Sequence, residues 1–388
     1  MSTRPLEGIL VVDFTTMVAG GSCTRMLADC GAQVIKLEAA EGGDLMRRAG
    51  NVQDGVSLFF ALYNAGKKSV VLDLKSPAGL EISKRLIERA DIVVENFRPG
   101  VMARLGLDYE TVSKINPKAV YCSISGFGQT GPLSQRAAYA PVAHAFSGFD
   151  MMLSRLPDRE APPPDNRVMI ADIVAGAYAF SAIQTALVHR LRNGVGSHVD
   201  VAMADSMMTL VGMQIQQAQH DALWPSGGFP SYATKDGYVN IPLVSPITYR
   251  QALKVMGRDD ILNDPEFQAS PATRRVEIIE ALRVWAAEHT SEECDTIMTA
   301  GGVPCAIYRM PHEVLDHPQT VARGSFTDVP TANGSFKILN PPFQISGAGV
   351  KAGTTVPALG EHTHDVLADI LGLSEADLAT AAGEKAFG

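Results

Sequence analysis

The stretch GILVVDFTTMVAGGSCTRMLADCGAQVIKLE (residues 8–38) decides the fold of this chain. It begins and ends with short apolar runs, 8–14 and 32–38, and residues 22–31 between them form a helical pattern. Continuously apolar runs of this length are typical of parallel strands that are buried on both faces. The order strand, helix, strand therefore predicts a right-handed βαβ unit.

Four more runs repeat the strand pattern within the first two hundred residues. Helical stretches separate them, such as 78–90, which follows Ser76 and Pro77 in an N-cap and N1 arrangement. The predicted strands are SVVLDL (69–74), DIVVENF (91–97), AVYCSIS (119–125) and SHVDVAM (197–203). We therefore predict an α/β fold for this part of the chain.

The pattern changes after residue 205. WPSGGFP (224–230) breaks a preceding helix with two glycines and two prolines, which indicates a domain boundary near 224. Residues 231 to about 325 mix a strand pattern with amphipathic helices and read as a smaller α+β domain. The remainder, 326–388, has strand signals followed by a helix-rich end. We expect domain ranges of 1–223, 224–325 and 326–388.

Composition limits the functional classes. The chain has 388 residues, of which 46% are hydrophobic, so it can bury a large core. A net charge of −9 predicts no general attraction to nucleic acid or to an anionic membrane. Five cysteines without CxxC spacing argue against a disulfide framework and a zinc site. The N-terminus lacks a signal-peptide pattern, so we expect a cytoplasmic protein without a membrane partner.

Asp172 combines a chemically reactive side chain with a distinctive place in the sequence. It precedes an apolar stretch, residues 173–191, that reads as a buried helix ending at Asn193 and Gly194. An Asp at that place is a preferred N-cap, and most such residues do no more than accept hydrogen bonds from free N–H groups. The same carboxylate could also act as a nucleophile.

Cations after two predicted strands point to a phosphate-bearing ligand. The turn NAGKK (64–68) is followed by a strand and then by Lys75, while VENFRPGVMARLG (94–106) places Arg98 in a loop and Arg104 six residues later. Ligands of α/β sheets bind beyond the carboxyl ends of strands, where Arg can hold phosphate oxygens. The alternative for each residue is a solvated surface charge.

Several familiar motifs are missing. SGFGQTGP (125–132) matches neither GxGxxG nor the phosphate loop that ends in GKS or GKT. The chain also contains no HExxH, GxSxG or paired-histidine motif, and His198 lies in a strand pattern typical of a structural histidine. Nucleotide hydrolysis, dinucleotide redox chemistry and a metal centre are therefore not predicted.

Taken together, the motifs above resemble those of the family III CoA-transferases, which include formyl-CoA transferase and carnitine CoA-transferase. The resemblance continues in HVDVAMADSM (198–207), YATKDGYVNI (232–241), NDPEF (263–267), AGGVPCAIYRMPHEVLDHPQ (300–319) and GEHTHDVL (360–367). It implies a homodimer of two chains interlocked like linked rings. Each chain would have a Rossmann-like large domain, made of N- and C-terminal segments, and a smaller domain between them.

The resemblance also implies a mechanism. Asp172 would attack an acyl-CoA thioester to form a mixed anhydride, and the released CoA would convert it into an aspartyl-CoA thioester. A small carboxylic acid would then take over the CoA and free Asp172. CoA would be a substrate rather than a tightly bound cofactor. A short glycine loop, Gly227 and Gly228, corresponds to a longer mobile loop in the family. The CoA contacts implied by motif are Lys75, Asn96, Phe97, Arg98, Arg104 and Tyr139.

Two alternatives remain open at this stage. The same family contains α-methylacyl-CoA racemases, which move an α-proton with a His and an Asp, but Tyr139 stands at the corresponding His position and is a poor base near neutrality. His144, five residues later, is expected on another part of a helix. The second alternative is a non-catalytic CoA-binding protein. The sequence selects neither the acyl donor nor the acceptor acid.

Overall fold

The structure is a computed structural model that describes residues 3–153, 163, 165–220 and 228–388. It contains two compact units, one made of Met1–Ala222 with Pro318–Gly388 and the other of Leu223–His317. Helix α16 (Pro318–Arg323), which we expected in the small domain, thus belongs to the larger unit. As functional domains, the ranges 1–223, 224–325 and 326–388 stay a prediction.

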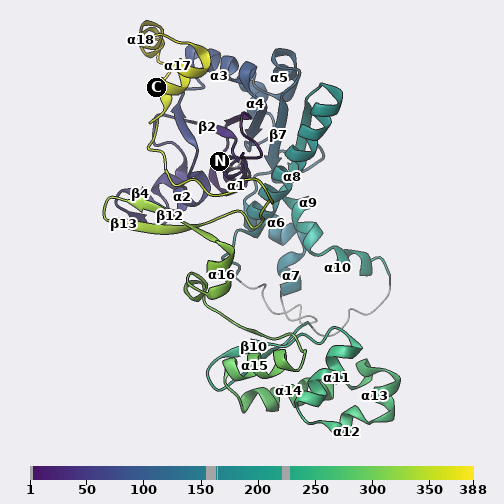
Figure 1. Cartoon of the computed structure of the whole chain (residues 1–388). Coiled ribbons are helices and arrows are strands. Elements are labelled where there is room, and N and C mark those ends of the chain that lie inside the picture. The colour runs from purple at the N-terminus through teal and green to yellow at the C-terminus, as the bar shows by residue number, and fades with distance from the viewer. Residues whose placement is uncertain (1–2, 154–162, 164, 221–227) are drawn as a thin grey trace. The chain divides into compact units, whose positions relative to one another are not determined.

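The larger unit is built on a six-stranded parallel sheet (Figure 1). Its strand order, β5-β2-β1-β6-β7-β8, is that of the doubly wound dinucleotide-binding folds. This confirms the predicted α/β class. From one edge to the other, the strands are β5 (Lys68–Val71), β2 (Gln33–Glu38), β1 (Leu10–Asp13), β6 (Ile92–Glu95), β7 (Val120–Ser125) and β8 (Ser197–Ala202).

Helices cover both faces of this sheet because its strands are apolar on both sides. One face packs, through residues such as Val11, Val94 and Cys122, on α1 (Met17–Asp29), α6 (Ala140–Ser147), α8 (Ile170–Asn193) and α9 (Met203–Leu210). The other face packs, through Val12 and Val93, on α3 (Pro77–Arg89), α4 (Val101–Leu105), α5 (Tyr109–Ile115), α17 (Thr363–Leu371) and α18 (Glu375–Gly383). Strand β1 near the start of the chain and helices α17 and α18 near its end therefore contribute to one core.

The neighbouring strands β1 and β6 are followed by helices on opposite faces of the sheet, because α1 follows β1 and covers one face while α4 follows β6 and covers the other. Such a switch point leaves a crevice at the carboxyl ends of the strands. Asn96 joins the two sides there: its Oδ1 accepts the Thr16 N–H at 2.9 Å, and its Nδ2 donates to the Thr16 carbonyl at 2.7 Å.

Smaller elements complete this unit. They are η1 (Leu45–Arg48), β3 (Val52–Gln53), β4 (Val56–Ser57), α2 (Leu58–Asn64), α7 (Phe149–Leu153), α10 (Gly212–Gln217) and the hairpin β12 (Phe326–Thr331) and β13 (Gly334–Leu339). Helix α2 contributes Phe60 and Tyr63 to an apolar cluster with Val18 and Met46. This cluster lies beside the start of α1.

The second unit has a three-stranded antiparallel sheet in the order β11 (Ala306–Ile307), β10 (Tyr238–Asn240), β9 (Ser231–Ala233). Tyr232, Val239 and Leu282 are among the residues of its core. Its helices are α11 (Pro246–Val255), α12 (Asp259–Leu262), α13 (Pro265–Ala269), η2 (Pro271–Arg274), α14 (Arg275–Ala287), α15 (Ser291–Ala300) and η3 (Pro311–Val314).

Candidate functional site

Asp172 lies inside the first turn of α8. The helix begins at Ile170 with Met169 at its N-cap, so the prediction that Asp172 caps the helix is wrong. The apolar residues before Asp172 continue the helical turn, and the Ala171 N–H is satisfied by an acceptor from another helix, His144 Nε2, at 3.0 Å. Asp172 is therefore not the N-cap of its own helix.

A glycine brings α8 close to α1. A Cβ atom at Gly176 would lie 2.0 Å from Ser22 Oγ and 2.7 Å from the Ala19 carbonyl oxygen, so only glycine fits without a shift of one helix. One turn earlier on α8, the Asp172 carboxylate accepts a hydrogen bond from the Ala19 N–H. Ala19 stands in the first turn of α1. The N-terminal ends of two helices, both positive by their dipoles, thus meet at one carboxylate.

Burial raises the pKa of Asp172 to about 6, and the N–H groups of Ala19 and of Asp172 itself oppose that rise. Among the described residues, no cation contributes to this shift. Burial also raises the pKa of Tyr63, and the charge of Asp172 adds to the rise. Asp172 is therefore a half-buried carboxylate beside an apolar cluster, ionised above pH 6 and poorly solvated, which is the state that favours nucleophilic attack.

Charged residues hold the loop between β1 and α1. Met17, the first residue of α1, has a left-handed φ of 61°, which is strained for a residue other than glycine. Its N–H donates to both carboxylate oxygens of Asp44, at 3.2 and 3.3 Å. Lys36 in turn lies 2.9 Å from Asp44 and donates to the Thr15 carbonyl at 2.8 Å. This network sets the direction in which α1 leaves the sheet.

Lys67, in the NAGKK turn, is fully buried rather than available to a phosphate. Its ammonium group donates to Asp13 at 3.0 Å, Thr24 at 2.7 Å and Asn64 at 2.9 Å. Burial lowers the pKa of Lys67 to about 8, against the charge of Asp13. The contribution of this residue to phosphate binding, suggested by the sequence, is therefore excluded by its position under the β1–α1 loop.

The residues implied as CoA contacts lie at the carboxyl ends of β5 and β6 or near α6. Asn96 and Phe97 follow β6 and are partly buried. The Asn96 side chain makes two hydrogen bonds with the main chain of Thr16. Lys75, Arg98 and Arg104 are exposed. Tyr139 stands at the N-cap of α6 and is 72% exposed.

The glycine loop is described only in part. Gly227 lies outside the described residues. Gly228 is exposed, belongs to the Leu223–His317 unit, and its carbonyl accepts a hydrogen bond from Arg275 at 2.9 Å.

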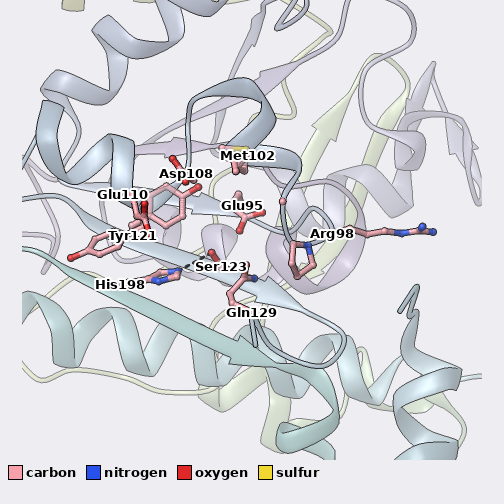
Figure 2. A pocket seen from close by; sticks show the side chains of 13 residues that line it. Glu95, Arg98, Met102, Asp108, Glu110, Tyr121, Ser123, Gln129 and His198 are labelled. Carbon is pink, nitrogen blue, oxygen red and sulfur yellow. Dashed lines mark hydrogen bonds between the residues drawn. The ribbon is translucent and has the colours of Figure 1, made fainter. Parts of the chain in front are cut away.

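A pocket of about 270 Å³ lies beside β6, β7 and β8, on the sheet face opposite to α1 and α8 (Figure 2). Glu95 lines it and accepts the Phe97 N–H at 2.9 Å, and Ser123 Oγ lies 3.1 Å from His198 Nε2. Burial raises the pKa of Glu95 to about 7. Figure 2 shows that the Arg98 side chain points away from these groups. The acidic lining, which includes Asp108 and Glu110, does not suit phosphate.

Three residues of the Asp172 site were not predicted from the sequence. Ala19 contributes only a main-chain group, Gly176 acts by its lack of a side chain, and His144 was expected elsewhere although it is buried against the start of α8. The sequence around each of these residues therefore gives no sign of its role in the site. Within the described residues, no group of three or more His, Cys, Asp or Glu is placed to hold a metal ion.

Known proteins resemble this chain along nearly its whole length. The model of the family described as CoA-transferase family III matches residues 6–363. The succinate–glutarate CoA-transferase of Agrobacterium fabrum is 34% identical, over 94% of this chain and 96% of the relative. The formyl-CoA:oxalate CoA-transferase of Streptomyces coelicolor is 31% identical, over 97% and 98%. A mutant of Rv3272 from Mycobacterium tuberculosis has a crystal structure with a TM-score of 0.85 and 29% identity, covering 96% of this chain and 100% of that chain.

Proposed function

This chain belongs to CoA-transferase family III and is an acyl-CoA:carboxylate CoA-transferase, and from that premise we propose that it works through covalent intermediates on Asp172. The observation that carries the proposal is the half-buried Asp172 carboxylate at the meeting of α1 and α8. A structural carboxylate in that place would normally have a cation partner or be the N-cap of its own helix. Among the described residues, no cation contributes to the pKa shift of Asp172, and Asp172 is not the N-cap of α8, although it accepts the Ala19 N–H in the first turn of α1.

The proposed reaction exchanges one anion for another at each step. A carboxylate oxygen of Asp172 attacks the thioester carbon, the C–S bond breaks, and CoA thiolate leaves behind a mixed anhydride. The thiolate then attacks the aspartyl carbonyl and releases the donor acid, which leaves an aspartyl-CoA thioester. The acceptor carboxylate and the thiolate repeat these two attacks in the opposite direction. No step transfers a proton, so no general base is required.

The Ala19 N–H fits the charge that develops during these steps. When the aspartyl carbonyl is attacked, its oxygen becomes negative, and a main-chain donor that already points at this carboxyl group can stabilise it without reorganisation. The dipoles of α1 and α8 act in the same direction. We propose the Ala19 N–H as one oxyanion donor. A second donor from the Gly227–Gly228 loop stays a prediction.

We propose that Lys75, Asn96, Phe97, Arg98, Arg104 and Tyr139 contact CoA. The support is their position: Lys75, Arg98 and Arg104 place exposed cations beyond the carboxyl ends of β5 and β6. Cations at this edge attract the phosphates of CoA, while Asn96 and Phe97 belong to the loop beside the start of α1. CoA would bind as a substrate.

Racemisation has less support. It needs two acid/base groups near one α-carbon. His144 is near Asp172 in space, but it is 1% exposed and its Nε2 lone pair accepts the Ala171 N–H. It cannot at the same time accept a proton from a substrate. Tyr139 is exposed and has no base beside it that would activate it among its described contacts.

We propose a homodimer, interlocked as the family resemblance implies, in the cytoplasm and without nucleic-acid or membrane partners. Helix α8 is long and apolar enough to cross a membrane, but its alanine-rich face packs in the core with α1. Its opposite face exposes Ile173, Tyr178, Val188 and Leu191. A second copy of the chain would cover such a face.

The test is a trapping experiment. The purified protein is screened with succinyl-CoA and formyl-CoA as donors and glutarate, oxalate and D-citramalate as acceptors, the substrates named in relatives. Active mixtures are quenched, and the Asp172 peptide is weighed by mass spectrometry. We expect a CoA adduct on that peptide and no transfer by Asp172→Ala. Asp365→Ala, an exposed carboxylate in the first turn of α17, is the control. Transfer by Asp172→Ala would refute the mechanism.

A further inference from the structure

Helix α8 is capped by a side chain from a different helix. The side chain of its own N-cap residue, Met169, accepts no first-turn N–H group. The Ile170 N–H donates to the Val168 carbonyl at 2.9 Å, and the Ala171 N–H donates to His144 Nε2, from α6, at 3.0 Å. The next N–H along, that of Asp172, donates to the Asp172 carboxylate itself. An imidazole therefore satisfies the donor immediately before the reactive residue.

This hydrogen bond specifies the state of the imidazole. Nε2 must carry a lone pair to accept an N–H, so His144 is neutral with its proton on Nδ1. The acceptor near the Nδ1 proton is Asp150 Oδ1, 4.0 Å away, since the Asn166 amide nitrogen, 3.5 Å from Nδ1, is itself a donor. Burial lowers the pKa of His144, and the charge of Asp150 opposes that effect. The lone pair on Nε2 is thus available throughout the neutral range.

The charged groups around His144 come from the helices that pack on α6. Asp150 stands on α7, Asp172 on α8, and Asp205 in the first turn of α9, where it is exposed. Asp150 is the carboxylate that acts on the titration of His144. An added proton on Nε2 would place an N–H group against the Ala171 N–H, so the first turn of α8 could not keep its position.

We propose that His144 is a positioning residue of the transfer reaction: its neutral imidazole holds the first turn of α8 and thereby the direction of the Asp172 carboxylate, and its protonation releases that turn. The inference rests on the proposed nucleophilic role of Asp172. His144 does not touch the reacting atoms. It acts through the main chain of Ala171, and a displacement of about 1 Å at a reacting group can reduce a rate by roughly 10²-fold.

Two variants separate positioning from packing. His144→Gln keeps an oxygen that can accept the Ala171 N–H but does not titrate, whereas His144→Phe fills the volume without an acceptor. We expect His144→Phe to lower kcat by about 10- to 100-fold with little change in the KM for acyl-CoA. His144→Gln should retain kcat within a factor of about three at pH 8. Equal loss in both variants, or wild-type kcat in His144→Phe, would overturn the proposal.

The slope of log kcat at acid pH distinguishes titration of His144 from a purely packing role, because packing alone does not change that slope. In the wild type, log kcat should fall with a slope approaching two, because Asp172 and His144 both become protonated. In His144→Gln the slope should be one. An unchanged slope of one in the wild type would contradict the titration of His144. This comparison needs only the wild type and His144→Gln, so it remains decisive if His144→Phe fails to fold.

The tautomer itself can be observed. In protein labelled with ¹⁵N-histidine, the His144 signals are identified by their loss in His144→Gln. We expect an unprotonated Nε2 and a protonated Nδ1 at pH 8, and the opposite tautomer would disprove the cap. This measurement does not depend on catalysis. Failure of the Asp172 mechanism would appear as transfer by Asp172→Ala, which is a different result.

Discussion

The main-chain N–H of Ala19 donates a hydrogen bond to the side-chain carboxylate of Asp172. The two residues are far apart in the chain and each stands in the first turn of its helix. Their contact depends on the close approach of α1 and α8 at Gly176, and on the loop that Asp44 holds at Met17. The Asp172 carboxylate is thereby placed where two helix dipoles favour negative charge although burial removes its water.

Gly176→Ala should damage both stability and catalysis. The new Cβ meets the Ala19 carbonyl oxygen at 2.7 Å, and a main-chain atom cannot rotate away as Ser22 Oγ can. We expect a loss of about 1–3 kcal/mol in the free energy of unfolding, measured in urea, and a lower kcat. Gly212→Ala is the control, since a Cβ there meets nothing within 4 Å. Wild-type kcat in Gly176→Ala would show that the helix approach does not matter.

The activity should depend on the ionisation of Asp172. Its pKa is raised to about 6, and only the ionised form is a nucleophile. The value of kcat/KM should therefore be flat above pH 6, fall about tenfold for each pH unit just below it, and fall more steeply where His144 is protonated as well. A pH profile with saturating acceptor measures this. Full activity at pH 4.5 would contradict the assignment.

Asp172→Asn should stabilise the protein in a pH-dependent way. Because the folded pKa lies above the unfolded value of 3.8, the ionised carboxylate costs stability above pH 6, and the cost vanishes as the pH falls toward 3.8. The gain from Asn should reach about 3 kcal/mol at pH 8 as an upper estimate. Urea unfolding at pH 8 and pH 4 measures it. A gain that is the same at both pH values would exclude the ionisation as its cause.

Lys67→Met should destabilise the chain strongly. It would leave the buried Asp13 carboxylate without its 3.0 Å partner, and breaking a buried ion pair costs about 3–5 kcal/mol. Lys68→Met, at the neighbouring half-buried position, should cost less than about 1 kcal/mol. Adding Asp13→Asn to Lys67→Met should recover part of the loss. Urea unfolding of the wild type, Lys67→Met, Asp13→Asn and the double variant decides whether the pair is coupled.

Arg98→Ala and Arg104→Ala should each raise the KM for acyl-CoA about tenfold while kcat changes little, because we propose that both residues bind phosphate outside the reacting centre. Added salt should reduce the difference from the wild type. Arg89→Ala, an exposed residue in the last turn of α3, is the control. An unchanged KM in both variants would remove these residues from the CoA site.

Much of this protein was determined by local sequence pattern. The apolar runs around Val11, Val34 and Val120 predicted parallel strands because a strand buried on both faces needs apolar side chains in succession. The family motifs identified the transferase, and the apolar stretch after Asp172 predicted the helix. Helix bounds were less exact, since α1 begins at Met17 and α8 at Ile170, where glycines and methionines mark no clear start.

The site itself was decided by tertiary structure. Nothing in the neighbourhood of Lys67 in the sequence shows that its ammonium group is buried on Asp13, and nothing around His144 shows that its lone pair faces Ala171. The Ala19 N–H has no side-chain signature at all. Sequence pattern reports which faces are apolar, whereas the direction of a donor and the pKa of a carboxylate depend on groups that only packing brings within a few ångströms.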